Sequence, residues 1–280
     1  MSVQFGSLAL CDVISDRIQA ASEQRITFAE FMELALYYPD YGYYTARNTQ
    51  LGFGGDFVTS VHLGQDFGEL LAVQLLEMWH KLGCPQPFHV VEMGPGQGIL
   101  AEIILSYWQT VAPECLAATH YTLVERSSSL RQVQQQRLQP LQDQGITIEW
   151  SMLAAIPQDS VVGCLFSNEL VDALPVHRVV LTEAGLQEQY ITTSNQENSR
   201  FQALLGDLST PALSHYFEPL GISIESPAYP LGYTTEVNLA ALPWLKQVAG
   251  KLHQGYVLTL DYGYTAQRYY SPTRSQGTLQ

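Results

Sequence analysis

The sequence has few charged residues, and it has no long hydrophobic run. Charged side chains make up 14% of the 280 residues and apolar side chains 46%. An average globular protein has about 25% charged residues. A disordered chain needs high charge and few aromatic residues, so this composition excludes disorder. A membrane-spanning helix needs about 18 or more apolar residues in a row. The sequence has no such run, so we expect a protein that is not embedded in a membrane.

Cysteines are also scarce, and the four present lie far apart without a CxxC pair: Cys11, Cys84, Cys115 and Cys164. The seven histidines show no metal-ligand spacing beside them. We therefore expect neither a metal site nor a disulfide framework, and we expect a reducing compartment. The N-terminus carries Asp12 and Asp16 and no early basic residue. This is wrong for a signal peptide and for a mitochondrial transit peptide, so we expect a cytoplasmic protein.

Basic residues are few, with 13 Lys and Arg against 27 Asp and Glu, which gives a net charge of −14. A negative field repels phosphate backbones, so we expect no nucleic acid as the main partner. A basic protein or a cationic ligand fits better. Solubility alone is the simpler explanation of the charge.

The first part of the chain reads as helical. Thr27 and Glu30 have the spacing of a capping box, and the helix that they begin ends before Pro39. Further on, apolar residues recur at spacings of three and four, which predicts a buried helical stripe. The stripe consists of Phe67, Leu70, Leu71, Leu75, Met78, Trp79 and Leu82.

From residue 87 short apolar strands alternate with helices. This alternation predicts a doubly wound α/β sheet with parallel strands and helices on both faces. The predicted strands are 87–94, 120–125, 146–150, 161–169 and 255–263, and the predicted helices are 99–111, 128–142 and 243–252. Helix 128–142 is rich in glutamine, which predicts a solvated face. Residues 176–193 alternate as an antiparallel hairpin does.

The most specific feature is a glycine-rich turn between a strand and a helix: Glu92-Met93-Gly94-Pro95-Gly96-Gln97-Gly98. Glycines let a ligand lie against bare main chain. A dinucleotide site needs GxGxxG to hold a pyrophosphate, but here the third glycine comes one residue early and Ile99 takes its place. The turn suits a ligand without phosphates whose amino-acid carboxylate and ribose approach it, namely S-adenosylmethionine.

Three acidic strand ends follow the turn. Glu125 ends the next strand, where a carboxylate can accept both hydroxyls of a ribose. An exposed strand-end acid is the alternative. Asn168 and Glu169 end strand 161–169 and Asp172 follows it, and the carboxyl ends of such strands face the ligand crevice. Glu169 and Asp172 have the spacing of one helical-turn face, or they cap a helix start. Asp261 holds the matching position at the end of strand 255–263, as a cap or as a crevice acid.

These motifs, in this order, resemble those of the MidA-like family of class I S-adenosylmethionine-dependent methyltransferases, which includes a mitochondrial complex I assembly factor. The matching segments are Phe28-Ala29-Glu30-Phe31-Met32, Leu36-Tyr37-Tyr38-Pro39, Gly42-Tyr43-Tyr44, Gly55-Asp56-Phe57-Val58-Thr59-Ser60, Phe67-Gly68, the glycine turn, Glu125 with Leu130-Arg131, Asn168-Glu169, Asp172-Ala173-Leu174-Pro175 and Asp261-Tyr262-Gly263-Tyr264.

The resemblance implies a Rossmann-like sheet of seven strands under an N-terminal helical cap. Residues 1–86 would form the cap and a loop that closes over the cofactor, and residues 87–280 the cofactor domain, with an insertion at about 176–236. Family chains continue well beyond residue 280, so we expect the final strands to be missing or shortened.

The resemblance also implies the site residues. The cofactor would be bound by Glu92, Gly94, Gly96, Gly98, Glu125, Asp56, Thr59 and Ser60. The catalytic residues would be Glu169, Asp172 and Asn168, acting on an arginine of a protein partner such as a respiratory complex I subunit. Two departures concern the loops. Val61 and His62 stand where the family has Pro-Glu, and Leu170 and Val171 replace aromatic residues.

Two other functions are compatible with these residues. A non-catalytic assembly or scaffold protein would retain cofactor binding without transfer, and a small-molecule methyltransferase would have a closed apolar acceptor pocket. A nicotinamide dehydrogenase fits worst, because Ile99 interrupts the phosphate turn.

Overall fold

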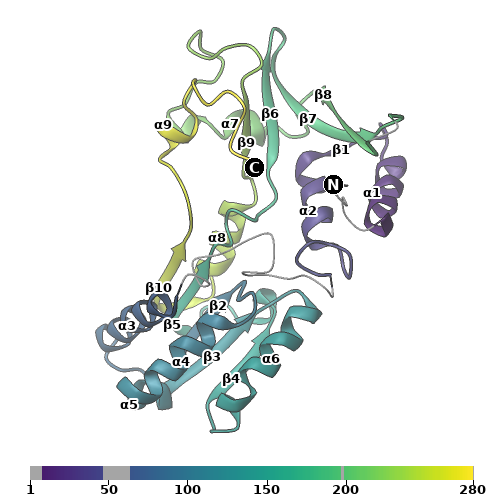
Figure 1. Cartoon of the computed structure of the whole chain (residues 1–280). Coiled ribbons are helices and arrows are strands. Elements are labelled where there is room, and N and C mark those ends of the chain that lie inside the picture. The colour runs from purple at the N-terminus through teal and green to yellow at the C-terminus, as the bar shows by residue number, and fades with distance from the viewer. Residues whose placement is uncertain (1–7, 47–63, 197–198, 280) are drawn as a thin grey trace. The chain divides into compact units, whose positions relative to one another are not determined.

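Two separate sheets organise the chain, and each belongs to a different compact unit. The computed structural model describes residues 8–46, 64–196 and 199–279 (Figure 1). Contacts group residues 45–173 and 244–261 into one unit, which we name the parallel-sheet unit. Residues 1–44, 174–243 and 262–280 form the other, the antiparallel-sheet unit. The domain boundaries predicted from the sequence, at residue 86 and around 176–236, stay a prediction.

The parallel-sheet unit contains the predicted α/β sheet. Its strand order is β10-β5-β2-β3-β4, and all four pairings are parallel. The strands are β2 (Phe88–Met93), β3 (Thr119–Val124), β4 (Thr147–Ser151), β5 (Val161–Asn168) and β10 (Leu252–Leu260). Met93 lies opposite Val124 and Ser167, and Asn168 lies opposite Leu260. The carboxyl ends of these strands therefore meet at one edge of the sheet. The resemblance implies seven strands, and within the described residues this sheet has five.

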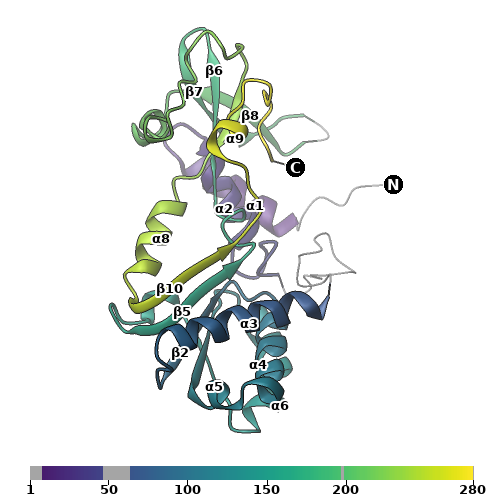
Figure 2. The same ribbon diagram turned by 90° about the vertical axis from the view of Figure 1, so that its left-hand side faces the viewer.

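Helices cover both faces of this sheet (Figure 2). One face carries α3 (Gln65–Lys81), α4 (Ile99–Val111), α5 (Pro113–Ala118) and α6 (Ser128–Gln142), and the other carries α8 (Ala241–Ala249). A 3-10 turn, η2 (Leu153–Ala155), follows β4. Successive strand side chains point to opposite faces, so Val90 packs with α4 and Val91 packs near Val248 of α8. Burial on both faces explains the continuous apolar strands.

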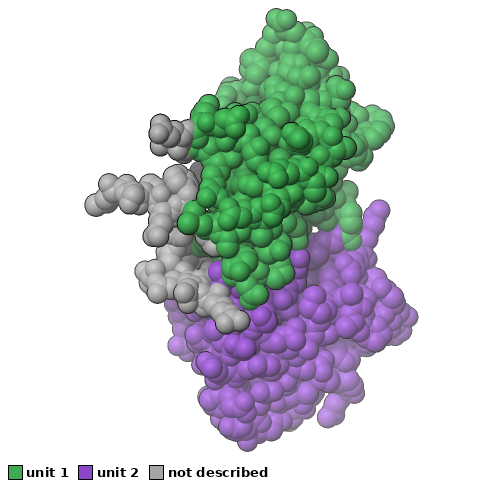
Figure 3. Space-filling view, turned by 90° about the vertical axis from the view of Figure 1, so that its right-hand side faces the viewer, with its two compact units in different colours: residues 1–44, 174–243, 262–280 green, residues 45–173, 244–261 purple. Residues whose placement is uncertain are grey.

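The antiparallel-sheet unit, drawn in green in Figure 3, has the strand order β1-β7-β6-β9, with β8 also paired to β7. Its elements are α1 (Leu8–Ala20), β1 (Ile26–Thr27), α2 (Phe28–Tyr37), β6 (His177–Thr182), β7 (Gly185–Thr193), β8 (Phe201–Gly206), α7 (Ala212–His215), η3 (Glu218–Leu220), β9 (Thr234–Val237) and α9 (Ala266–Tyr269). The predicted hairpin is confirmed by the pairing of β6 with β7. Thr27 Oγ1 accepts the N–H of Glu30 at 3.1 Å, as predicted, while the Glu30 carboxylate pairs with Arg17.

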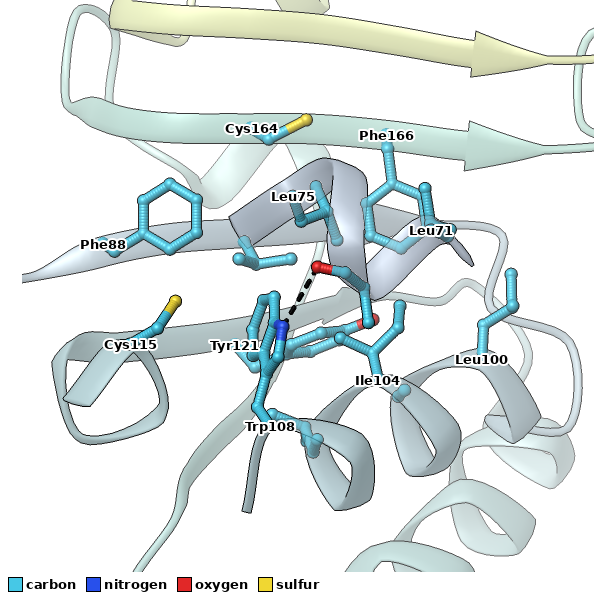
Figure 4. Packing of buried hydrophobic residues seen from close by; sticks show 14 of the residues in the cluster. Leu71, Leu75, Phe88, Leu100, Ile104, Trp108, Cys115, Tyr121, Cys164 and Phe166 are labelled. Carbon is cyan, nitrogen blue, oxygen red and sulfur yellow. Dashed lines mark hydrogen bonds between the residues drawn. The ribbon is translucent and has the colours of Figure 1, made fainter. Parts of the chain in front are cut away.

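The core of the parallel-sheet unit joins α3 and α4 to the sheet (Figure 4). Trp108 Nε1 donates to the Ala72 carbonyl at 3.0 Å, and both residues are fully buried. Leu71, Leu75, Met78 and Trp79 of the predicted stripe are buried. The prediction is wrong for Leu70, which is 70% exposed. Adjacent helical residues point about 100° apart, so Leu71 takes the core position and Leu70 faces solvent. No helix in the described parts of the chain has the length and apolar character to span a bilayer.

Candidate active site

The glycine turn joins the end of β2 to the start of α4. Gly94, Gly96 and Gly98 have φ of +67°, +54° and +77°, a left-handed conformation that glycine adopts at little cost. A Cβ atom added at Gly96 would have no neighbouring heavy atom within 4 Å among the described residues. At Gly94 a Cβ would lie 2.9 Å from Leu170 Cδ1. The turn therefore presents bare main chain to open space at Gly96.

Glu125 lies directly after β3 and is only 7% exposed. Its Oε1 accepts the N–H of Ser127 at 2.7 Å, and its Oε2 accepts Gln134 Nε2 at 3.1 Å. Burial raises the pKa of Glu125, and these hydrogen bonds work against that rise. Hydrogen bonds therefore fix the carboxylate of Glu125, which is not an exposed strand-end acid. The Arg126 backbone also bonds this carboxylate, and because an ionised carboxylate has about four acceptor positions, capacity remains for a ribose hydroxyl.

Glu92 is a second buried acid at this sheet edge. Tyr121 donates its hydroxyl to Glu92 Oε2 at 2.7 Å. Burial raises the pKa of Glu92 to about 8, and the charge of Glu125 adds to the effect. The charge of Glu125 thus disfavours ionisation of Glu92, and a positively charged ligand beside these acids would offset that effect.

Helix α6 holds the glycine turn through contacts that sequence reasoning missed. Gln134 Nε2 donates to the Gly96 carbonyl at 2.7 Å, and Arg137 Nε donates to the Gln97 carbonyl at 3.0 Å. The prediction of a solvated glutamine face is correct for Gln132, Gln135, Gln136 and Gln139 and wrong for Gln134, which is fully buried. One signal was available, because Gln134 has helical spacing to three buried leucines: Leu130, Leu138 and Leu141.

The residues after β5 form a turn. Asn168 is the last residue of β5, and Glu169, with φ of +49°, donates its N–H to the Leu260 carbonyl at 2.8 Å. Ala173 then donates its N–H to the Leu170 carbonyl at 3.3 Å. The predicted helical-turn face for Glu169 and Asp172 is therefore wrong, because residues 169–174 form bends and a turn and no helix begins there.

Asp261 holds this turn from the end of β10. Its Oδ2 accepts the N–H groups of Val171 at 2.9 Å and of Asp172 at 3.2 Å, so its role as a cap is shown. Partial burial of the carboxyl group and the charges of Asp261 and Glu169 raise the pKa of Asp172 to about 6. Three acidic side chains thus come together at the ends of β5 and β10.

The glycine turn with Glu125 and the turn 169–174, which we name the acidic turn, share one edge of the sheet. Leu170 of the acidic turn lies against Gly94 and so connects them. Asp56, Thr59 and Ser60 lie outside the described residues, as do Val61 and His62, so their roles stay predictions. Across the described residues, no cluster of His, Cys, Asp and Glu could hold a metal ion. The bare main chain at Gly96 and the held carboxylate of Glu125 fit the amino-acid part and the ribose of S-adenosylmethionine.

Comparisons with known proteins point to the same ligand. The sequence model of a family described as "Putative S-adenosyl-L-methionine-dependent methyltransferase" matches residues 70–280. The Drosophila melanogaster protein named "Protein arginine methyltransferase NDUFAF7 homolog, mitochondrial" is 30% identical over 275 residues, which cover 90% of this chain and 60% of that protein. The Mus musculus protein "Protein arginine methyltransferase NDUFAF7, mitochondrial" is 32% identical over 208 residues, 67% of this chain and 47% of that protein.

Two solved structures are similar to nearly the whole chain. A Burkholderia thailandensis protein bound to S-adenosyl-homocysteine superposes with a TM-score of 0.79 and 27% identity, over 96% of this chain and 66% of that chain. A native crystal structure from the same organism has a TM-score of 0.77 and 28% identity, over 96% and 65%. The chain thus spans about half to two thirds of the length of these relatives. It belongs to the MidA-like family of class I S-adenosylmethionine-dependent methyltransferases.

Proposed function

We propose that this protein is a methyltransferase that uses S-adenosylmethionine and methylates an arginine side chain of a protein partner. The observation that carries the proposal is the open main chain at Gly96 beside the held carboxylate of Glu125, at the sheet edge where the acidic turn also lies. The bound S-adenosyl-homocysteine in the similar Burkholderia protein supports the choice of cofactor.

The acidic turn supports arginine as the acceptor. A guanidinium stays charged in water, with a pKa above about 12, and it can pair with carboxylates through two parallel hydrogen bonds. Burial raises the pKa of Asp172, and the charges of Asp261 and Glu169 add to that rise, so a cation beside Asp172 offsets the repulsion from these two acids. The Drosophila and mouse relatives are named protein arginine methyltransferases, which supports the same acceptor.

The mechanism consists of positioning and electrostatics. S-adenosylmethionine, when bound, supplies a methyl group on a positively charged sulfur that is open to in-line displacement. Glu92, Glu125 and the three glycines would hold the cofactor, while Glu169 and Asp172 would orient the guanidinium and accept the proton that its methylated nitrogen gives up. Asn168 supports the turn as the last residue of β5, and Asp261 caps it. Fixing two reactants in line removes entropy from the barrier, and fixed carboxylates stabilise charge near the acceptor.

The proposed partner is a protein that presents an arginine to this turn. The family resemblance indicates a respiratory complex I subunit as the candidate. A cytoplasmic location stays a prediction.

Glu169→Gln tests the function, with Glu114→Gln on the exposed first turn of α5 as the matched control. Both variants should bind S-adenosyl-homocysteine like the wild type, measured by calorimetry. A strain that lacks the protein is then complemented with each form, and methylarginine in its respiratory-complex proteins is measured by mass spectrometry. We expect the wild type and Glu114→Gln to restore the modification and Glu169→Gln not to restore it.

Three outcomes would contradict parts of the proposal. If the strain without the protein loses no methylarginine, arginine is the wrong acceptor. If cofactor binds but no lysate protein accepts a labelled methyl group, a non-catalytic assembly role is the better explanation. If Glu169→Gln restores full modification, Glu169 has no catalytic role.

A further inference from the structure

Gln134 contacts groups at three strand ends, although it lies on α6. Its Nε2 donates to the Gly96 carbonyl after β2 at 2.7 Å and to Glu125 Oε2 after β3 at 3.1 Å. Its Oε1 accepts Trp150 Nε1 of β4 at 2.9 Å. The side chain is fully buried, so water does not compete for these bonds. One amide thus connects the glycine turn to the acid that follows the next strand.

Trp150 determines which way the amide of Gln134 points. An indole N–H only donates, so the atom of Gln134 that faces it must be the oxygen. The NH₂ group therefore faces Gly96 and Glu125, which both present acceptors. A rotated amide would bring oxygen against oxygen at two of these contacts and leave the indole without an acceptor. Leaving buried polar groups unpaired is unfavourable, so the observed orientation is strongly preferred.

The stem of Gln134 also lies against the turn. A Cβ atom added at Gly98 would approach Gln134 Cγ to 3.3 Å, which is tighter than ordinary contact. Arg137, one turn further along α6, holds the next carbonyl of the turn, that of Gln97, at 3.0 Å. Two consecutive carbonyls of the glycine turn are thus bound by side chains of α6. The position of the turn relative to Glu125 depends on this helix.

We propose that Gln134 is a positioning residue for the cofactor, which sets the separation between the main chain at Gly96 and the carboxylate of Glu125. The proposal rests on the proposed function. Gln134 occupies one acceptor position of Glu125 Oε2 and, together with the backbone N–H groups that bind the same carboxylate, fixes its rotation so that the remaining acceptor capacity faces the ribose. Without Gln134, Oε2 loses this partner and the carboxylate is oriented less firmly, so the ribose loses a directed contact while the main chain at Gly96 stays available.

The test compares S-adenosylhomocysteine with its 2′-deoxy analogue, which lacks one ribose hydroxyl. Dissociation constants for both are measured by calorimetry on the full chain. The wild type should bind the parent compound about 10-fold more tightly, because a hydroxyl bound to a carboxylate forms a strong hydrogen bond. Gln134→Met keeps the length of the side chain and removes its hydrogen bonds. We expect this variant to bind the parent compound more weakly and to reduce the ratio of the two dissociation constants, analogue over parent, to about threefold or less.

The ratio of the two dissociation constants distinguishes a positioning role of Gln134 from a general structural role. Loosening of the whole turn would weaken both compounds by the same factor and leave the ratio unchanged, and that result would overturn the proposal. Gln135→Met on the exposed side of α6 is the matched control and should change neither dissociation constant. If Gln134→Met does not fold, Trp150→Phe serves instead, because it removes the donor that orients the amide and keeps an aromatic ring at this position. It should reduce the ratio in the same direction, and an unchanged ratio would count against the proposal.

The test also distinguishes this inference from the proposed function. A wild-type protein that binds neither compound contradicts the proposed function itself. A wild type that binds both equally contradicts the contact between Glu125 and the ribose, and with it the role of Gln134. A wild type that discriminates, together with a Gln134→Met variant that discriminates equally well, contradicts only the positioning role.

Discussion

The Asp261 carboxylate accepts the backbone N–H of Asp172 at 3.2 Å and so ties the end of β10 to the turn after β5. The same oxygen also accepts the N–H of Val171, at 2.9 Å. The turn that carries Glu169 and Asp172 has no helix to order it, so this contact fixes its shape. A residue 89 positions away in the chain therefore decides where the proposed catalytic acids lie.

Replacing Asp261 should affect transfer far more than cofactor binding. Asp261→Ala removes the acceptor for two N–H groups, and we expect methyl transfer to fall about 10-fold as the turn loses its fixed geometry. Binding of S-adenosyl-homocysteine should change little, because the glycine turn and Glu125 are untouched. Asp261→Asn keeps an acceptor oxygen and should retain most activity. Transfer is measured as labelled methyl groups incorporated into proteins of a strain that lacks this protein. A parallel loss of cofactor binding in Asp261→Ala would contradict the assignment.

Gly96→Arg should abolish cofactor binding, and Gly145→Arg should not. Both glycines have positive φ, +54° and +88°, and among the described residues an added Cβ at either would meet no heavy atom within 4 Å. A left-handed non-glycine residue costs about 1–2 kcal/mol, so both variants should lose similar stability. Only the side chain at position 96 enters the proposed cofactor space. Calorimetry with S-adenosyl-homocysteine and thermal unfolding check the two expectations. Unchanged affinity in Gly96→Arg would overturn the location of the site.

Glu92 should make the protein less stable as the pH rises. Its pKa is raised from 4.5 to about 8, so the folded state binds the proton more tightly than the unfolded state does. The stabilisation from the neutral form is fully present below the unfolded pKa and is lost as the pH rises through about 8. Glu92→Gln keeps an acceptor for Tyr121 and removes the titration. Between pH 5 and 8 the free energy of unfolding of Glu92→Gln, measured by urea denaturation, should fall by less than that of the wild type. The difference between the two falls should be on the order of a few kcal/mol. Equal slopes for both proteins would show that Glu92 is ionised in the folded state throughout.

Methyl transfer should decline as the pH falls through about 6, the raised pKa of Asp172. Below that value the carboxyl group is neutral and no longer pairs with a guanidinium. Asp172→Asn should lower the plateau and remove this acidic limb of the pH profile, while Asp143→Asn at the exposed C-cap of α6 should leave the profile unchanged. The profile is measured at saturating S-adenosylmethionine. A wild-type profile that is flat between pH 5 and 8 would exclude a charged Asp172 from the reaction.

Much of the parallel-sheet unit is predictable because its signals are local. Helix 128–142 has the predicted bounds, since Ser127 caps its start by accepting the N–H of Leu130. The turn from Gly94 to Gly98 needs positive φ at three positions, and only its glycine spacing encodes that need. Strand segments such as 88–93 are apolar on both faces, which marks them as central strands of a parallel sheet.

Long-range contacts decided those parts of the candidate site that local sequence signals did not predict. The sequence by itself determined the alternation of strands and helices, the glycine turn and the acidic strand ends, because periodicity and backbone preference act over a few residues. Only the tertiary structure decided that Gln134 is buried against Gly96, 38 positions away, and that Asp261 caps a turn 89 positions away. Those contacts depend on the register of parallel strands and on how α6 packs at their ends. A glutamine among glutamines has the same local sequence signal whether it faces solvent or holds the turn.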